Sequence, residues 1–216
     1  MPRSMPKFDD VLISESVRAT DLVVAGELAR AQIPIKKYWR VTKLEDLYEL
    51  AFLRVFVRWE ICLEEVFLRS LCGYSSSAGV EVLTTGATHF RSINLAKTAV
   101  YGSNNYLLWH NPRTVINRIR GFIMPRSATN PGQQEYVISS YISRLEHFAA
   151  IRHRIAHGQE DAKNKFDRAS LAIAGRTYLG SKPGRLLRDP LPGVTPKQTY
   201  FETICSELCG LMSQMV

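Results

Sequence analysis

The chain has 216 residues, a formal net charge of +8 and an apolar fraction of 45%. These values are typical of a globular protein, and they exclude collagen-like, mucin-like and wholly disordered chains. No apolar run reaches the roughly 18 residues of a membrane span, and the first ten residues lack the apolar core of a signal peptide. We therefore expect a single cytoplasmic domain over residues 1–216, with no membrane partner.

The first half of the chain predicts two helices. Residues 8–30 carry apolar side chains at helical spacing. A longer helix is expected over residues 43–71, about 43 Å in length and with a wide apolar stripe. Thr42 and Glu45 fit a capping box at its start. Residues 75–105 are rich in Ser, Gly and Thr, so we expect loops there with one or two short helices.

The second half predicts three more helices and a hairpin. Asn111-Pro112 fits a helix start, with Asn as the N-cap and Pro in the first turn. Residues 132–157 have a second strong apolar stripe. Within residues about 171–188 the letters SKPG favour the turn of a small β-hairpin. Thr195-Pro196 would start the last helix, with Gln198 completing a capping box.

These elements together predict an all-α fold, a bundle of four or five helices with a small late β-hairpin. The bundle core would span about residues 44–157, the C-terminal helix over 196–215 would join it, and the hairpin at 171–188 would be an appendage. The sequence contains no GxGxxG, Walker, HExxH or GxSxG motif. Dinucleotide enzymes, P-loop NTPases, zinc proteases and serine hydrolases of the common types are therefore not favoured.

The helix expected over 132–157 carries a cation within its apolar stripe. On a wheel with about 100° per residue and Leu145 at zero, Ile138 falls at about +20°, Phe148 at about −60° and Arg152 at about −20°. A buried guanidinium costs several kcal/mol unless it is paired, and it does not escape by losing its proton. Arg152 is therefore expected to meet a carboxylate, a subunit interface or an anion in a cleft.

Two histidines follow Arg152 at helical spacing. His153 and His157 are four residues apart, so on a helix they stand one turn above each other. A histidine beside a fixed cation has a lowered pKa and stays neutral near pH 7. Neutral imidazole accepts a proton and imidazolium donates one. An arginine that holds a phosphate and a histidine that moves a proton suffice to cleave RNA, because the 2′-hydroxyl is the nucleophile and no metal is required.

The string AIRHRIAHG resembles the R-x4-6-H motif of the HEPN superfamily, with Arg152 and His157 at its ends and His153 as the polar companion of the arginine. Members of this superfamily are small helical bundles found in toxins, abortive-infection proteins and RNA-cutting CRISPR effectors. The resemblance implies a metal-independent endoribonuclease that acts as a toxin or antiviral effector without a cofactor. It carries over Arg152, His157 and His153 as the catalytic residues.

The same resemblance implies partners. HEPN members dimerise through their motif helices, so that two Arg–His pairs share one composite cleft, and a cognate antitoxin or another defence-system partner can accompany them. Arg152 and His157 lie about 140° apart on a regular helix, so a twofold axis would bring the arginine of one copy beside the histidine of the other. Some toxin members have a tyrosine two residues after the histidine. Gln159 stands there in this chain, so modification of that tyrosine is not carried over.

A basic segment follows the motif. Between residues 162 and 188 the chain has seven basic residues and a single acid, Asp167. A local positive surface attracts polyanions, RNA among them. We therefore assign RNA binding to Lys163, Lys165, Arg168 and Arg176. The alternative is a solvated positive face that serves solubility.

Several structural alternatives stay open. Arg152 could form an internal ion pair with Glu60 or Glu64. If it does not, we expect these two carboxylates either to lie close enough to orient the Arg152 side chain or to form a solvated face of their helix. His157 could be a C-terminal helix cap before a glycine. No third ligand stands in register with the two histidines, so no metal site is predicted. The four cysteines form no CxxC pair and are expected to be small buried side chains.

The function also has an alternative. A HEPN-like bundle without turnover would serve as an RNA-binding module, a scaffold or an antitoxin. Such a protein would oligomerise and bind RNA in a salt-dependent manner without cutting it.

Overall fold

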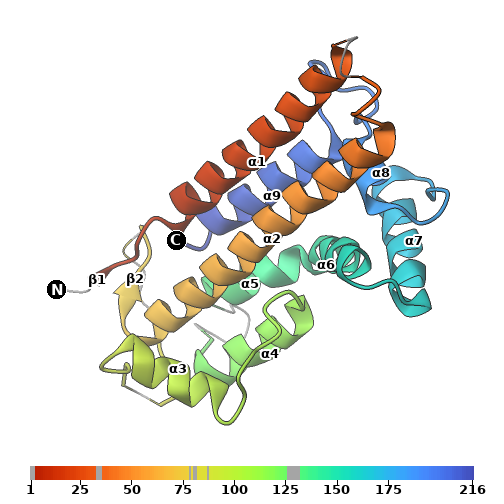
Figure 1. The fold of residues 1–216 in the computed structure, drawn as a ribbon. Coiled ribbons are helices and arrows are strands. Elements are labelled where there is room, and N and C mark those ends of the chain that lie inside the picture. Colours follow the sequence, from red (N-terminus) through yellow and green to blue (C-terminus); the bar gives the residue numbers. More distant parts are fainter. Residues whose placement is uncertain (1–2, 33–35, 78, 80–81, 87, 126–131) are drawn as a thin grey trace. The chain divides into compact units, whose positions relative to one another are not determined.

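The computed structural model describes residues 3–32, 36–77, 79, 82–86, 88–125 and 132–216 (Figure 1). Over these residues it contains nine helices and a single sheet of two short parallel strands, so the predicted all-α class is confirmed. The HEPN type of bundle and the single domain over 1–216 stay predictions. In the described part of the chain no helix combines the length and the apolar character that crossing a membrane requires.

The elements follow one another along the chain as shown in Figure 1. They are β1 (Arg3–Ser4), α1 (Phe8–Ala31), α2 (Val41–Leu71), β2 (Tyr74–Ser75), α3 (Ile93–Tyr101), α4 (Pro112–Phe122), α5 (Gln133–Ser140), α6 (Ile142–Ala156), α7 (Glu160–Ala174), α8 (Pro183–Arg188) and α9 (Tyr200–Ser213). The two long helices expected in the first half correspond to α1 and α2. The short helix expected within residues 75–105 is α3.

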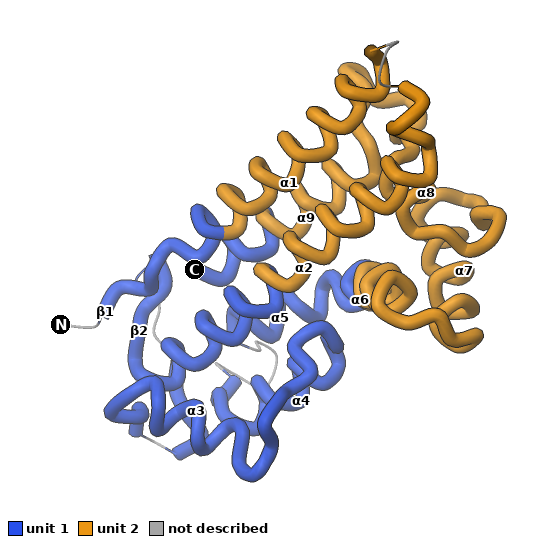
Figure 2. The backbone as a smooth tube through the Cα atoms, viewed as in Figure 1, with its two compact units in different colours: residues 1–11, 59–145, 210–216 blue, residues 12–58, 146–209 orange. Residues whose placement is uncertain are grey.

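The chain clusters into two compact units, drawn in different colours in Figure 2. Unit 1 consists of residues 1–11, 59–145 and 210–216, and unit 2 of residues 12–58 and 146–209. Four helices, α1, α2, α6 and α9, contribute residues to both units.

Unit 1 is built around the second half of α2. The Phe67 ring lies 5.6 Å from the Trp109 ring and 6.2 Å from the Phe122 ring, measured between centroids. All three side chains belong to a cluster that joins α2 to α4 and to the loop before it. Gln134 of α5 donates from Nε2 to Ser70 Oγ of α2 at 2.6 Å, a buried hydrogen bond that fixes α5 against α2.

The start of α4 confirms the prediction for Asn111-Pro112. The Asn111 side chain accepts a hydrogen bond from the Thr114 amide at 3.2 Å, and Pro112 occupies the first turn. The asparagine therefore satisfies one of the amides that a helix leaves unpaired at its start.

In unit 2 the helices α1, α2 and α9 lie side by side (Figure 1). The Tyr48 ring of α2 meets the Phe201 ring of α9 edge to face at 5.9 Å. A Cβ on Gly26 would lie 3.1 Å from Leu44 Cδ2, so the absence of a side chain at residue 26 lets α1 approach α2 closely. Arg188 of α8 adds an ion pair to Glu27 of α1, with Nε and Oε1 2.6 Å apart.

The capping box expected at the start of α2 is wrong. The helix begins at Val41, so Thr42 lies inside its first turn and not before it. Glu45 is buried, and its carboxylate pairs with Arg185 at 3.4 Å and with Lys182 at 3.7 Å. Glu45 is therefore held by two cations from a distant segment and does not cap the start of the helix, although its spacing from Thr42 had predicted that it would.

The capping box of the last helix is real but begins four residues later than predicted. Helix α9 begins at Tyr200, not at Thr195-Pro196. The Thr199 hydroxyl accepts from the Glu202 amide at 3.2 Å, and the Glu202 carboxylate accepts from the Thr199 amide at 2.6 Å. Thr199 and Glu202 thus form the reciprocal pair that the sequence pattern suggested for Thr195 and Gln198.

Replacing Thr199 with alanine is expected to lower the free energy of unfolding by about 1 kcal/mol, because the Glu202 amide loses its acceptor. For a chain of this length that corresponds to a fall of about 2–4 °C in Tm, measured by differential scanning calorimetry. Thr195→Ala is the matched control, since Thr195 is exposed and precedes the helix. A control that loses as much stability as Thr199→Ala would contradict the assignment.

The helix expected over residues 132–157 is two helices. Helix α5 ends at Ser140, and Tyr141 leaves the helical conformation with φ −114° and ψ 17° before α6 begins at Ile142. Ser139 and Ser140 precede the break, and serine is a weak former of helix interiors because its hydroxyl competes for backbone groups. The break changes which residues share a face with Arg152.

The β-hairpin predicted over residues 171–188 is wrong. Helix α7 extends to Ala174, and Pro183 opens the short helix α8. Glu49 of α2 accepts the Gly184 amide at 2.9 Å and so satisfies the start of α8 from outside the segment. Ser181 adopts a positive φ of 48° just before the helix, which gives the turn that the letters SKPG indicated.

Two of the cysteines are buried as expected. Cys62 and Cys205 are buried, whereas Cys72 and Cys209 are half-buried, and no disulfide joins any of the four. Burial raises the pKa of the Cys205 thiol to about 12. The thiol is therefore protonated at neutral pH and is a poor nucleophile.

Candidate functional site

The motif residues lie at the C-terminal end of α6 in unit 2. The buried face of this helix consists of Leu145, Phe148 and Ile151. On the same wheel these side chains centre on about −60°, so Arg152 lies about 40° from the middle of the face. The apolar pattern of the sequence placed Arg152 at the centre because it included Ile138, which belongs to α5, and left out Ile151, which is buried. In agreement with a flanking position, Arg152 is half-buried.

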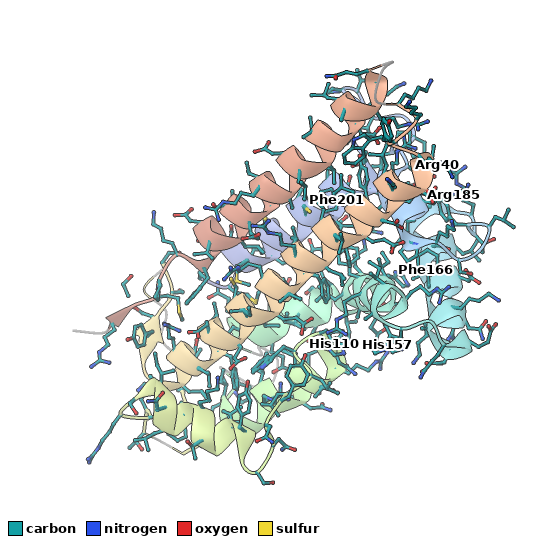
Figure 3. All side chains as sticks on the ribbon, viewed as in Figure 1. Arg40, His110, His157, Phe166, Arg185 and Phe201 are labelled. Atoms are coloured by element: carbon teal, nitrogen blue, oxygen red, sulfur yellow. The ribbon has the colours of Figure 1, made fainter. Side chains whose placement is uncertain are left out.

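The two histidines are in contact. Their ring centroids are 4.7 Å apart with a tilt of 55°, as expected for residues one helical turn apart. His153 is half-buried, and His157, the first residue after α6, is exposed (Figure 3). The His157 amide donates to the His153 carbonyl at 2.9 Å, and Arg154 Nη1 donates to the His157 carbonyl at 3.4 Å. The end of α6 therefore has a fixed backbone with one imidazole open to solvent.

The environment of His153 favours its neutral form. Burial lowers the pKa of His153 below its ordinary 6.5, and the nearby His157, Lys165 and Arg152 lower it further, whereas Asp161 opposes them. The Asp161 carboxylate lies 4.0 Å from His153 Nε2. The lowering of the His153 pKa agrees with the expectation for a histidine beside a cation, but burial contributes more to it than the neighbouring charges do.

This lowered pKa predicts a pH dependence of stability. The unfolded chain takes up the His153 proton near pH 6.5, above the pH at which the folded chain does. Between the two pKa values the unfolded state binds more protons, so the free energy of unfolding falls as the pH drops through 6.5 toward the lower pKa of the folded chain. His153→Asn is expected to make this fall shallower in urea unfolding at a series of pH values. An equally steep fall in the variant would contradict the prediction.

The basic residues of α7 are partly balanced by acids just before the basic segment. Lys163 Nζ lies 3.1 Å from Glu160, and Lys165 Nζ lies 2.7 Å from Asp161. Arg168 is exposed and donates from Nε to the Asn164 carbonyl at 3.3 Å. The structure therefore brings three of the four assigned RNA-binding residues to one helix beside the histidines. The net positive charge of this helix is smaller than that of residues 162–188, because Glu160 and Asp161 also belong to it.

The fourth residue, Arg176, lies elsewhere. It follows the end of α7, where its guanidinium pairs with Asp189 and donates from Nε to the Tyr178 hydroxyl at 3.3 Å. There it lines a cavity together with Arg185 and Arg188 of α8. Sequence reasoning missed this cavity because residues around 41–45 form its other wall, and no local pattern connects segments that lie so far apart in the chain.

Glu60 and Glu64 lie on the part of α2 that belongs to unit 1. Glu60 is 7% exposed and accepts from the Tyr106 hydroxyl at 3.2 Å, so a solvated face is wrong for this residue. Glu64 accepts from the Tyr101 hydroxyl at 2.7 Å and pairs with Lys97 at 3.2 Å. Both carboxylates are thus held by side chains of unit 1.

Among the described residues, no group of three or more His, Cys, Asp or Glu side chains has an arrangement that could hold a metal ion. The chain was compared with models of protein families, with curated proteins and with solved structures, and none of them matches it. The functional interpretation therefore depends on the chemistry of these side chains and on the motif that they form.

Proposed function

We propose that the chain is a metal-independent endoribonuclease of HEPN type that acts as a toxin or antiviral effector. The observation that carries the proposal is the grouping of Arg152, His153 and His157 at the end of α6, with the two imidazole rings 4.7 Å apart. A fixed cation and two imidazoles supply the groups that cleavage of a phosphodiester by a neighbouring hydroxyl requires.

In the proposed reaction the 2′-oxygen of RNA forms a bond to phosphorus as the bond to the 5′-oxygen breaks. Neutral imidazole takes the proton from the 2′-hydroxyl, and imidazolium gives a proton to the departing 5′-oxygen. His157 as imidazolium gives its proton to the departing 5′-oxygen, and His153, whose pKa is lowered by burial, assists as the neutral partner that takes the 2′-hydroxyl proton. The Arg152 guanidinium balances the charge that grows on the phosphate oxygens.

The proposal includes a homodimer. On a regular helix Arg152 and His157 would be about 140° apart, a spacing that favours a phosphate shared between two copies over one held by a single copy. Two copies related by a twofold axis would place the arginine of one beside the histidine of the other. Lys163, Lys165 and Arg168 would then bind the RNA backbone on either side.

The decisive experiment uses the purified full chain with a labelled single-stranded RNA in EDTA. We expect cleavage that leaves a 2′,3′-cyclic phosphate and a 5′-hydroxyl, both identified by mass spectrometry. Absence of cleavage under conditions where the protein is folded would reject the enzyme. Cleavage that requires added Mg²⁺ would reject the metal-independent chemistry.

A non-catalytic binding module remains the second candidate because α1 carries an exposed apolar stripe. Ile13, Val17, Val24 and Leu28 are 41%, 54%, 45% and 63% exposed, and they share one face of the helix within about 60°. The buried residues of α1 lie on the opposite face. An apolar stripe of this length is typical of a surface that contacts another protein, such as an antitoxin or a scaffold partner. RNA binding without cleavage would favour this function.

A further inference from the structure

Unit 2 contains a cavity of about 400 Å³ between the start of α2 and the segment around α8, which we call the α2–α8 pocket. Its lining includes Val41 from α2, Tyr178 and Leu179 from the segment before α8, and the three arginines 176, 185 and 188. A volume of this size falls within the roughly 300–1,000 Å³ of typical small-molecule sites.

Three guanidiniums at one cavity point to an anionic ligand. The side chains of Arg176, Arg185 and Arg188 are 61%, 47% and 32% exposed, so a ligand has access to them. Each is held by one carboxylate, from Asp189, Glu45 and Glu27 respectively. A guanidinium has five N–H donors, so one carboxylate leaves donors for a further acceptor.

The surroundings of the α2–α8 pocket strengthen the positive field. Lys182 lies 3.7 Å from Glu45, so with the three arginines four cations lie at this end of unit 2, together with the carboxylates of Glu27, Glu45 and Asp189 and that of Glu49 at the start of α8. The segment that leads into α2 and the first turn of α2 add four exposed basic side chains, Lys36, Lys37, Arg40 and Lys43. Figure 3 shows Arg40 at the same end of α2 as Arg185. Asp46 is the exposed acid nearby in the sequence. The first turn of α2 contributes the positive end of a 31-residue helix.

The remaining wall suits a flat organic group. The Tyr178 ring is buried under the Arg176 guanidinium, 5.2 Å from the ring centroid, and its hydroxyl donates to Asp189 Oδ2 at 2.7 Å, so the ring is fixed in place and holds Arg176 at the pocket. Burial raises the pKa of Tyr178 to about 12, so the phenol stays neutral and does not repel an anion. Leu179 is 86% exposed and Val41 is half-buried, so both offer apolar surface beside the ring.

We propose that the α2–α8 pocket binds a nucleoside phosphate, with the phosphate on Arg176 and Arg185 and the base against Leu179 and Val41. Arginine suits this role because its planar donor fork matches phosphate oxygens. The ligand is either a free mononucleotide or one nucleotide of an RNA chain, since both present the same chemistry. The site uses none of the α6 motif residues and does not depend on cleavage.

The experiment is isothermal titration of the full chain with AMP, adenosine, inorganic phosphate and a short 2′-O-methyl RNA, which the proposed reaction does not cut. The variants are Arg176→Gln with Arg185→Gln, and the control is Arg18→Gln, an exposed arginine on α1. All proteins are first compared by circular dichroism and Tm. The His157→Ala background gives the same test independently of any ribonuclease activity.

We expect AMP to bind more tightly than adenosine or phosphate, with at least a tenfold loss in the double variant and none in the control. Binding of the 2′-O-methyl RNA alone, lost in the double variant and kept in the control, would support the pocket with RNA as the source of the nucleotide. Absence of binding by every probe, or binding that the double variant retains, would overturn the proposal. An equal loss in Arg18→Gln would also overturn it. If the double variant does not fold, Arg185→Lys together with Leu179→Ser replaces it, because lysine keeps the charge beside Glu45 but lacks the planar donor fork. A tenfold loss of AMP or RNA binding is again expected, and its absence would contradict the proposal.

Discussion

Replacing His157 with alanine is expected to lower the rate of RNA cleavage by about 10²–10⁴-fold, the usual contribution of a general acid or base. His157 is exposed just beyond the end of α6, so the substitution removes an imidazole without opening a cavity in the core. The rate is measured under single-turnover conditions with labelled RNA in EDTA. His147→Ala on the same helix is the control, and its rate is expected to stay near that of the unchanged protein.

The dimeric form of the site makes a second measurement possible. Arg152→Ala should also be nearly inactive, because a cation that stabilises transition-state charge contributes about 10²–10³-fold. If the two groups act across a dimer, mixing Arg152→Ala with His157→Ala chains restores intact sites in mixed dimers. Random exchange then gives about a quarter of full activity. No recovery on mixing, with exchange verified by light scattering and labelled subunits, would reject the composite site.

Replacing Gly184 with alanine is expected to lower the free energy of unfolding by about 3 kcal/mol, the upper part of the range for overpacking. A Cβ on Gly184 would overlap the Glu45 carbonyl oxygen and lie 2.8 Å from Glu45 Cα. Both are backbone atoms of α2, so no side chain can rotate to make room. The substitution also disturbs the hydrogen bond from the Gly184 amide to Glu49.

The change is measured by urea unfolding monitored by circular dichroism, and it corresponds to a fall in Tm of about 6–12 °C. Gly121→Ala is the matched control. Gly121 lies in α4, and nothing lies within 4 Å of the position its Cβ would occupy. Because alanine is the better helix former, the control is expected to keep or slightly raise stability. A Gly184→Ala protein as stable as the control would show that α8 does not press on α2.

Local patterns predicted the long helices well. The apolar spacing predicted the ends of α1 and α2 to within two residues, because an apolar stripe several turns long fits the period of a helix and no other element. The cap at Asn111 was also predictable, since donor and acceptor are three residues apart in the chain. The contact between His153 and His157 follows in the same way from helical spacing alone.

Tertiary contacts decided the elements that the sequence did not predict. Helix α8 replaced the expected hairpin because Glu49, far away in the chain, accepts the Gly184 amide. Glu45 likewise forms ion pairs with Arg185 and Lys182 and does not cap the start of α2 as expected. The α2–α8 pocket was not predictable either, because its walls come from residues 41–45 and 176–189, which are far apart in the chain.

The carboxylates that hold the pocket arginines have a kinetic consequence. Glu27, Glu45 and Asp189 keep Arg188, Arg185 and Arg176 ordered before any ligand arrives, so little side-chain entropy is lost on capture. The same carboxylates compete with the incoming phosphate for the guanidiniums, and this competition shortens the residence time of the complex. Fast arrival and fast departure suit a pocket that exchanges its nucleotide rapidly, whether that nucleotide is free or part of an RNA chain, rather than one that retains it.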